Sequence, residues 1–309
     1  MILGYLLVLG AFGLFTAWLA GGALVPAWLL ALRRRPTLGR WTPLLASVPL
    51  VLGLTATLAA VIPGDPHGAS LLGCHCATSV PGWVHLCPLH PASALPLLAP
   101  ALAVLALLSA PRLRSLVGWL RAPRGLGGDG QPELTDLHAP TALLVGWLRP
   151  TLAVDPRLWS TLDAPSRAAV LAHERAHLTR RDPLVLHLLR LLTLPLPLRA
   201  RRALLDSWLE RAELQADAHA ARVVGDPLLV ADALVRCARL GPTTEPTLGW
   251  TGGRVERRVH ALLGPAPTLA EAPDWRWGDA LLLLALQVSL AAATPWLHHE
   301  LEHLLNLFR

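Results

Sequence analysis

The sequence predicts a mainly α-helical membrane protein, with four transmembrane helices and a cytoplasmic domain that contains a small β element. The chain of 309 residues is 53% hydrophobic, and its mean hydropathy of +0.46 is higher than soluble domains normally show. Its apolar residues gather in long runs with few charges, as membrane spans require. It also holds 12 Trp against one Tyr and three Phe, several of them near the ends of these runs, where interfacial anchors lie.

Four apolar segments account for the predicted spans. The first runs from Ile2 to about Leu32 without a charge, and it is too long for a signal peptide and has no basic start. We expect it to be a membrane helix, tilted or broken near Gly21-Gly22 and Pro26. The other three segments cover about 41–62, 92–110 and 280–297.

The arginines predict the orientation of these spans. The stretches 33–40 and 111–124 each hold four Arg and no acid, whereas the loop 63–91 holds no Arg and one acid. The positive-inside rule places the two basic stretches in the cytoplasm and loop 63–91 outside. The same clusters explain the net charge of +6, so we expect no direct nucleic-acid binding. The predicted parts are three spans at 1–111, a cytoplasmic domain at 112–277 after a linker at 124–132, and a fourth span with a short outer tail at 278–309.

The stretch "STLDAPSRAAVLAHERAHLTRRD" predicts a helix that carries a metal-binding motif. Asp163 is a suitable N-cap, and Pro165 falls in the first turn. On a helix, His173 and His177 lie one turn apart on one face, so both imidazoles can reach one Zn²⁺. Glu174 would then stand beside a zinc-bound water, whose pKa the metal lowers, and take its proton as general base.

A third ligand is expected from a second helix. A catalytic zinc site has three protein ligands and an open position, and "DSWLERAELQADAHAARVV" is helix-like and rich in acids. Glu213 and Asp217 are spaced i,i+4, so both can face the first helix. We expect Glu213 to bind the metal and Asp217 to hydrogen-bond a liganding histidine. His219 is a candidate for stabilising a tetrahedral intermediate, against the simpler interpretation of a packed or surface histidine.

The two motifs together resemble a known family. "HERAHLTRRD" followed by "ERAELQADAHA" is similar to the integral-membrane zinc metallopeptidases of the BlaR/MecR type, which are related to HtpX-like and prenyl-protein proteases. The resemblance implies a zincin-like (gluzincin) domain, His173, His177 and Glu213 as zinc ligands, Glu174 as catalytic acid/base, and Asp217 as their hydrogen-bonding support. A penicillin-binding sensor domain does not follow the fourth span, so the resemblance predicts the chemistry and not β-lactam sensing.

These observations predict a zinc-dependent endopeptidase of the inner (cytoplasmic) membrane. The protein would pass the membrane several times, its catalytic domain would be cytoplasmic, and its substrate would be a protein or peptide, by resemblance a transcriptional repressor in a signalling pathway. A protease for membrane-protein quality control and a non-catalytic membrane metal sensor are the alternatives. The arginines around the motif argue against a site inside the bilayer.

Two further segments bear on the site. The stretch 141–154 is the best strand candidate, either a core hairpin or an edge that pairs with an extended substrate. The apolar stretch 183–198 is too short to span comfortably, so we expect a helix against the membrane surface or the domain core, with His187 packed inside. Cys237 is expected to be a buried thiol.

The outer loop and the C-terminal tail are rich in possible metal ligands. Disulfide formation and metal binding both remain open for the loop. The tail stretch "HHELEH" repeats the spacing of His173, Glu174 and His177, with His299, Glu300 and His303. It would share a second Zn or Cu site with the loop, or form a polar helix end at the outer surface. The loop residues concerned are Cys74, Cys76, Cys87, His75, His85 and His90.

Overall fold

The computed structural model describes residues 2–61, 97–121, 132–137, 139–240 and 255–264, with isolated positions beyond residue 280. Within these ranges the protein is mainly helical, with one small sheet. The predicted outer loop, the fourth span and the C-terminal tail lie outside the described residues. The helices are α1 (Ile2–Arg34), α2 (Thr42–Val61), α3 (Leu98–Arg121), α4 (Pro156–Thr161), α5 (Ala164–Thr179), α6 (Asp182–Leu192), α7 (Leu198–Val224), α8 (Pro227–Leu240) and α9 (Val255–Leu263), with a 3₁₀ turn η1 (Pro36–Trp41).

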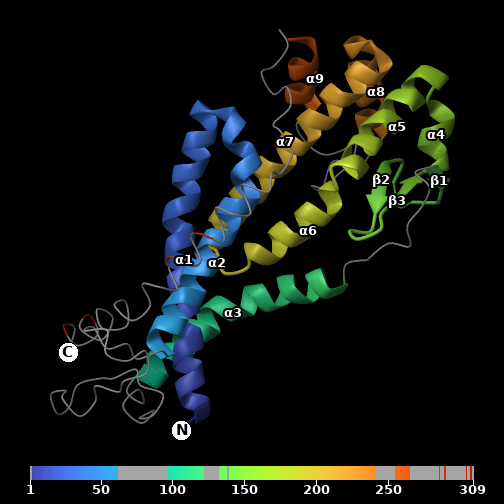
Figure 1. Ribbon diagram of the computed structural model, residues 1–309. Coiled ribbons are helices and arrows are strands. Elements are labelled where there is room, and N and C mark those ends of the chain that lie inside the picture. Colours follow the sequence, from blue (N-terminus) through green and yellow to red (C-terminus); the bar gives the residue numbers. More distant parts are fainter. Residues whose placement is uncertain are drawn as a thin grey trace.

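Helices α1 and α2 form an antiparallel pair at one side of the molecule (Figure 1). Each is long and apolar enough to cross a membrane, as predicted for the first two spans. Glycines bring them together: a Cβ on Gly53 would lie 2.4 Å from the carbonyl oxygen of Gly13, and one on Gly13 would lie 2.1 Å from Thr57 Oγ1. Such small residues let membrane helices pack closely. Pro26 lies within α1, which continues through it as a single helix.

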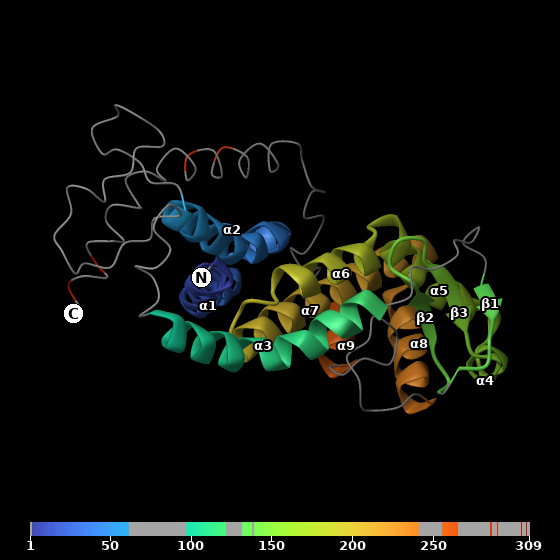
Figure 2. The same cartoon turned by 90° about the horizontal axis from the view of Figure 1, so that it is seen from below.

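Helix α3 differs from the predicted third span. It begins at Leu98 and continues to Arg121, past the predicted end near residue 110. The physical reason is that arginines end an apolar run without ending a helix, because Leu and Arg are both good helix formers. Seen from below in Figure 2, α3 starts beside α1 and extends away from it beneath α6.

The sheet has three strands in the order β1-β3-β2. The predicted strand stretch forms a hairpin: β2 (Ala142–Val145) pairs antiparallel with β3 (Thr151–Val154), and Gly146 turns the chain with φ 99°. Such a positive φ favours glycine. The short strand β1 (Pro132–Leu134), which the sequence pattern did not indicate, pairs parallel with β3 on its other side. Among the described residues β2 is therefore an edge strand, and it contacts α5.

Two apolar clusters hold these parts together, and α7 contributes to both. One cluster joins the sheet to α4, α5, α8 and the second half of α7. The other joins α6 and the first half of α7 to α1 and α2, through Val25, Ala46, Leu189, Leu204 and Trp208. The apolar stretch after Asp182 thus packs against the paired helices, in line with its predicted place beside the membrane or the core. Helices α6 and α7 connect the candidate spans to the sheet domain.

Candidate metal centre

Helix α5 presents the two histidines of the first motif. Asp163 caps the helix as predicted, since its side chain accepts a hydrogen bond from the backbone N–H of Ser166 at 2.9 Å. Pro165 follows in the first turn. His173 and His177 then lie one turn apart and are both fully buried. Their Nε2 atoms are 3.1 Å apart.

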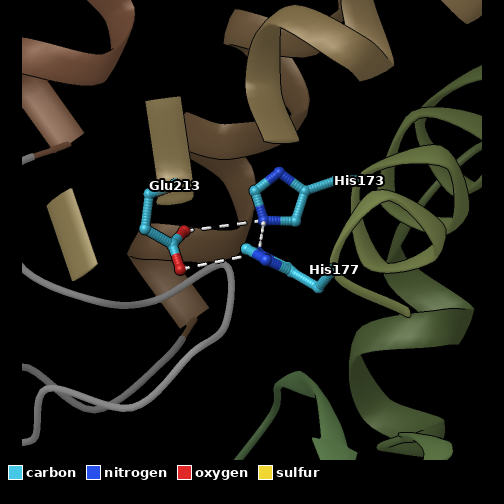
Figure 3. A group of neighbouring side chains, drawn as sticks. All are labelled: His173, His177 and Glu213. Carbon is cyan, nitrogen blue, oxygen red and sulfur yellow. Dashed lines mark hydrogen bonds and ion pairs between the residues drawn. The ribbon is translucent and has the colours of Figure 1, made fainter. Parts of the chain in front are cut away.

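Helix α7 supplies the third residue of the group. Glu213 places one carboxylate oxygen 3.5 Å from His173 Nε2 and the other 3.7 Å from His177 Nε2. Figure 3 shows the three side chains pointing toward one another. Among the described residues this buried His173–His177–Glu213 group could hold a metal ion, with its ligand atoms all within 4.8 Å of one another.

The spacing of these atoms fits a tetrahedral ion. Zinc bonds to imidazole nitrogen and carboxylate oxygen of about 2.0–2.2 Å put the ligand atoms of a tetrahedron roughly 3.3–3.6 Å apart. The two Nε2 atoms are 3.1 Å apart, and the 3.5 and 3.7 Å distances join them to different oxygens of Glu213. The group therefore has about the dimensions that a first-row transition metal requires.

The outer nitrogens of the two rings are held by carboxylates. His173 Nδ1 lies 2.9 Å from Asp217 Oδ1, and His177 Nδ1 lies 2.6 Å from Asp182 Oδ2. Because an ionised carboxylate only accepts, these two contacts favour the tautomer that carries its proton on Nδ1. In the neutral rings both Nε2 lone pairs then face each other and the carboxylate of Glu213. Such a convergence of acceptors is stable only around a cation.

Without a metal, a proton can take the place of that cation. Burial lowers the pKa of His173, but hydrogen bonds to Asp217 and Glu213 outweigh it and raise the pKa to about 9. Burial lowers the pKa of His177, and the neighbouring charge of His173 lowers it further. Burial raises the pKa of Glu213, but the charge of Arg258 more than offsets it, so the pKa ends below its usual value. The neighbouring carboxylates thus favour a positive charge on His173, whereas burial disfavours one on His177.

Arginines surround the carboxylates. Arg258, on α9, is 3% exposed and donates from Nε and Nη2 to the two oxygens of Asp217 at 2.7 and 2.6 Å. Its Nη1 lies 2.8 Å from Glu213 Oε2. Arg180 pairs with Asp182 and also donates to the carbonyl oxygen of Ala212 at 2.9 Å. The two arginines thereby connect the end of α5 and the whole of α9 to the stretch of α7 that holds Glu213.

The turn between α5 and α6 brings Asp182 back to the site. Arg181 has φ 55° and ψ 35°, a left-handed conformation that residues other than glycine rarely adopt. This conformation separates the end of α5 from the start of α6 at Asp182, and the Asp182 carboxylate reaches His177 from there. The strain is offset by the hydrogen bonds that Asp182 makes with His177 and Arg180.

Unlike Glu213, Asp217 and Asp182, Glu174 makes no ion pair within the described residues. It is fully buried, and neither carboxylate oxygen has a hydrogen-bond partner within the described residues. Burial raises its pKa to about 8. A buried carboxyl without partners is costly, and a raised pKa is typical of a group that takes up and releases protons near neutral pH.

The structure brings the predicted metal ligands and Asp217 together, whereas the other singled-out histidines of the described residues and Cys237 lie outside this group. Glu213 and Asp217 face His173 as expected, and Cys237 is buried with its pKa raised to about 12 by burial. His187 is also buried and stacks on Trp147, with ring centroids 4.0 Å apart. His219 is half-buried on α7, and no ligand-like contact joins it to the group. The Cys/His loop residues and the tail motif lie outside the described residues.

Sequence reasoning gave no role to Asp182, Arg180 or Arg258. One signal for Arg258 was present: in "VERRVHALL" it occupies the same helix face as Val255, Val259 and Leu262, which pack against the core. A charged residue on an apolar face indicates a buried partner. Asp182 lies five residues after His177, a separation of little more than one helical turn.

Comparison of the chain with protein-family models, with curated proteins and with solved structures gave no match. The resemblance of its two motifs to the membrane zinc metallopeptidases remains a prediction from the sequence.

Proposed function

We propose that the protein is a membrane-anchored zinc-dependent endopeptidase that cleaves peptide bonds at the cytoplasmic face of the membrane. One observation supports this above all others. His173 belongs to a buried group of two histidines and a glutamate, and it is followed directly by Glu174, which is buried without a hydrogen-bond partner among the described residues. Three protein ligands leave a fourth position open, which distinguishes catalytic from structural zinc sites. A site made only to store or sense a metal has no use for Glu174.

Zinc is the metal that the donors favour. Two imidazole nitrogens and one carboxylate oxygen suit Zn²⁺, whereas all-oxygen sites suit Mg²⁺ or Ca²⁺. When bound by His173, His177 and Glu213, zinc would polarise the peptide carbonyl and lower the pKa of a water molecule. The remaining chemistry belongs to side chains of this chain.

Glu174 is the proposed proton carrier. Its carboxylate takes a proton from the attacking water as the new C–O bond forms, and it hands that proton to the leaving amine nitrogen as the C–N bond breaks. The burial that raises its pKa to about 8 makes the carboxylate a stronger base than an exposed glutamate. Asp217 and Asp182 keep the two imidazoles in the tautomer that leaves each Nε2 free to bind the metal.

The substrate is proposed to be a protein segment in extended form. Strand β2 is an edge strand beside α5, so its outer backbone groups can pair with a peptide. The membrane anchor consists of α1 and α2, with two further spans expected from the sequence. By resemblance, a transcriptional repressor is the substrate class, which would make the protein a signalling protease.

The test compares two Glu→Gln variants. Glu174→Gln should retain the metal and lose cleavage of an unstructured protein substrate by at least about 100-fold, since general acid–base catalysis contributes 10²–10⁴-fold. Glu210→Gln is the matched control, because Glu210 lies on α7 three residues before Glu213 and pairs with Arg257 instead of the metal group. Cleavage by Glu174→Gln at the wild-type rate would rule out the proposed role.

A further inference from the structure

The corner between α6 and α7 packs against the middle of α1. This corner, residues 188–202, contains four Arg and no acid. A Cβ on Gly21 would lie 2.7 Å from Leu196 Cγ, and one on Gly22 would lie 3.6 Å from Pro197 Cγ. Leu196 is fully buried, and the contact is possible because Gly21 has no side chain. The corner is therefore fixed at one level along α1 (Figure 1).

That level is well separated from the arginines at the end of α1. Twelve residues of helix separate Gly21 from Arg33, which corresponds to roughly 18 Å. If the bilayer surface lay at Arg33, the corner would be roughly 18 Å deep, near the centre of a hydrocarbon core of about 30 Å. All four guanidinium groups of the corner would then sit in hydrocarbon, where each is costly.

The surface of the corner suits a membrane–water interface instead. Leu188 and Leu198 are 45% and 42% exposed. Arg190, Arg199 and Arg202 are exposed beside them, and their guanidinium groups pair with no acid in the described part of the chain. Leucines that alternate with unpaired arginines match the boundary between acyl chains and anionic headgroups.

We propose that the α6–α7 corner binds anionic phospholipid headgroups through Arg190, Arg199 and Arg202, and that it thereby sets the bilayer surface at Gly21-Gly22. The span within α1 is then 2–20, with 19 residues and a length of about 28 Å, which matches the hydrocarbon thickness. The rest of α1, from Gly22 to Arg34, stands outside the bilayer as a support for α7.

The position of the bilayer surface at Gly21-Gly22 limits which substrates can reach the metal group. This limit rests on the proposed function, whereas lipid binding does not. Glu213 lies 15 residues beyond Leu198 on α7, or up to about 22 Å along the helix. The metal group is thereby held away from hydrocarbon. Its substrates are water-exposed protein segments and not bonds within a membrane span.

The first experiment measures the dissociation constant of phosphatidylglycerol for the full-length protein in an uncharged detergent, by native mass spectrometry. Replacing the three arginines with Gln should weaken binding on the order of 100-fold, because each Arg near an anionic surface contributes about fivefold. The matched control replaces Arg33, Arg34 and Arg35 with Gln and should change binding less than twofold. Replacement with Lys at the corner should retain most of the affinity.

Three outcomes would overturn the proposal. The first is a loss of affinity in the Arg33–Arg35 control instead of the corner variant. The second is equal binding of uncharged phosphatidylcholine. The third is displacement of the lipid by equimolar inorganic phosphate, which would identify a free-anion site. Far-ultraviolet circular dichroism of each variant reports whether its helices are folded, independently of metal binding and proteolysis.

A second measurement does not depend on the arginine variants. Single nitroxide labels at Leu30 and Leu198, in a protein whose native cysteines are replaced, are compared in vesicles for access to oxygen and to a water-soluble nickel chelate. The label at Leu30, which is 51% exposed, should contact the chelate, and the label at Leu198 should lie at the acyl boundary. A label at Leu30 that oxygen reaches and the nickel chelate does not would place the bilayer surface at Arg33 and refute the proposal.

Discussion

Arg258 offers the sharpest test of how the metal group is held. Its guanidinium is buried and pairs with both Asp217 and Glu213 at 2.6 to 2.8 Å. Replacing it with Met keeps a similar volume but removes the guanidinium with which both buried carboxylates pair. Breaking a buried ion pair by removing one partner costs about 3–5 kcal/mol. We expect the free energy of unfolding of the metal-free protein to fall by about that amount.

Metal should reverse part of this loss. A bound dication supplies positive charge to the same two carboxylates, so zinc should stabilise Arg258→Met more than it stabilises the wild type. The assay is thermal unfolding followed by tryptophan fluorescence, with excess chelator and then with excess zinc. Arg257→Gln is the control, because Arg257 is exposed and its pair with Glu210 should contribute less than about 1 kcal/mol. A wild-type melting temperature for Arg258→Met in chelator would refute the proposed electrostatic role.

Three other predictions follow from the same contacts. Asp182→Asn should weaken zinc binding about 10–100-fold, because carboxylates that hydrogen-bond liganding histidines contribute that much. Asp206→Asn should leave zinc binding unchanged. Competition with a calibrated chelator measures the affinity of both variants. Cys237 is buried with a pKa of about 12, so it should resist a thiol reagent at pH 8 until the protein is denatured. The measurement uses a variant in which Cys74, Cys76 and Cys87 are replaced by Ser, and rapid labelling of the folded protein would contradict the burial of Cys237. Asp155 accepts hydrogen bonds from Arg157 and from the N–H of Leu137, and the Arg157 side chain holds its pKa well below the usual range. Its stabilising effect should therefore be present above the ordinary aspartate pKa of about 4 and be lost as the pH falls below it. The difference in melting temperature between wild type and Asp155→Asn should shrink over that range, and a constant difference would contradict the assignment.

The parts of the site that the sequence predicted are those set by local geometry. A helix begun by Asp163 and Pro165 fixes His173 and His177 on one face, and the i,i+4 spacing of Glu213 and Asp217 fixes both carboxylates on another helix. Each of these relations depends only on helical periodicity. The structure adds that the two faces meet, which periodicity alone cannot establish.

What the sequence did not predict depends on contacts between distant segments. Arg258 reaches Asp217 across 41 residues, and nothing in the local pattern of α9 specifies that partner. Strand β1 has three residues, two of them exposed, so it carries no periodic signal and forms only because β3 offers it an edge. The sequence predicted a first span that runs to about Leu32, whereas we infer from the contact of Leu196 with Gly21 that the bilayer surface lies at Gly21-Gly22.

The His173–His177–Glu213 group is proposed to bind one catalytic zinc ion. Elemental analysis of the purified protein counts that ion, in a background with Cys74, Cys76 and Cys87 replaced by Ser so that the outer loop does not add to the count. We predict one zinc ion per chain in this background and in its Glu174→Gln variant, and none after His173 and His177 are both replaced by Ala. Zinc that persists after replacement of both histidines, or a background protein that binds none, would contradict the account.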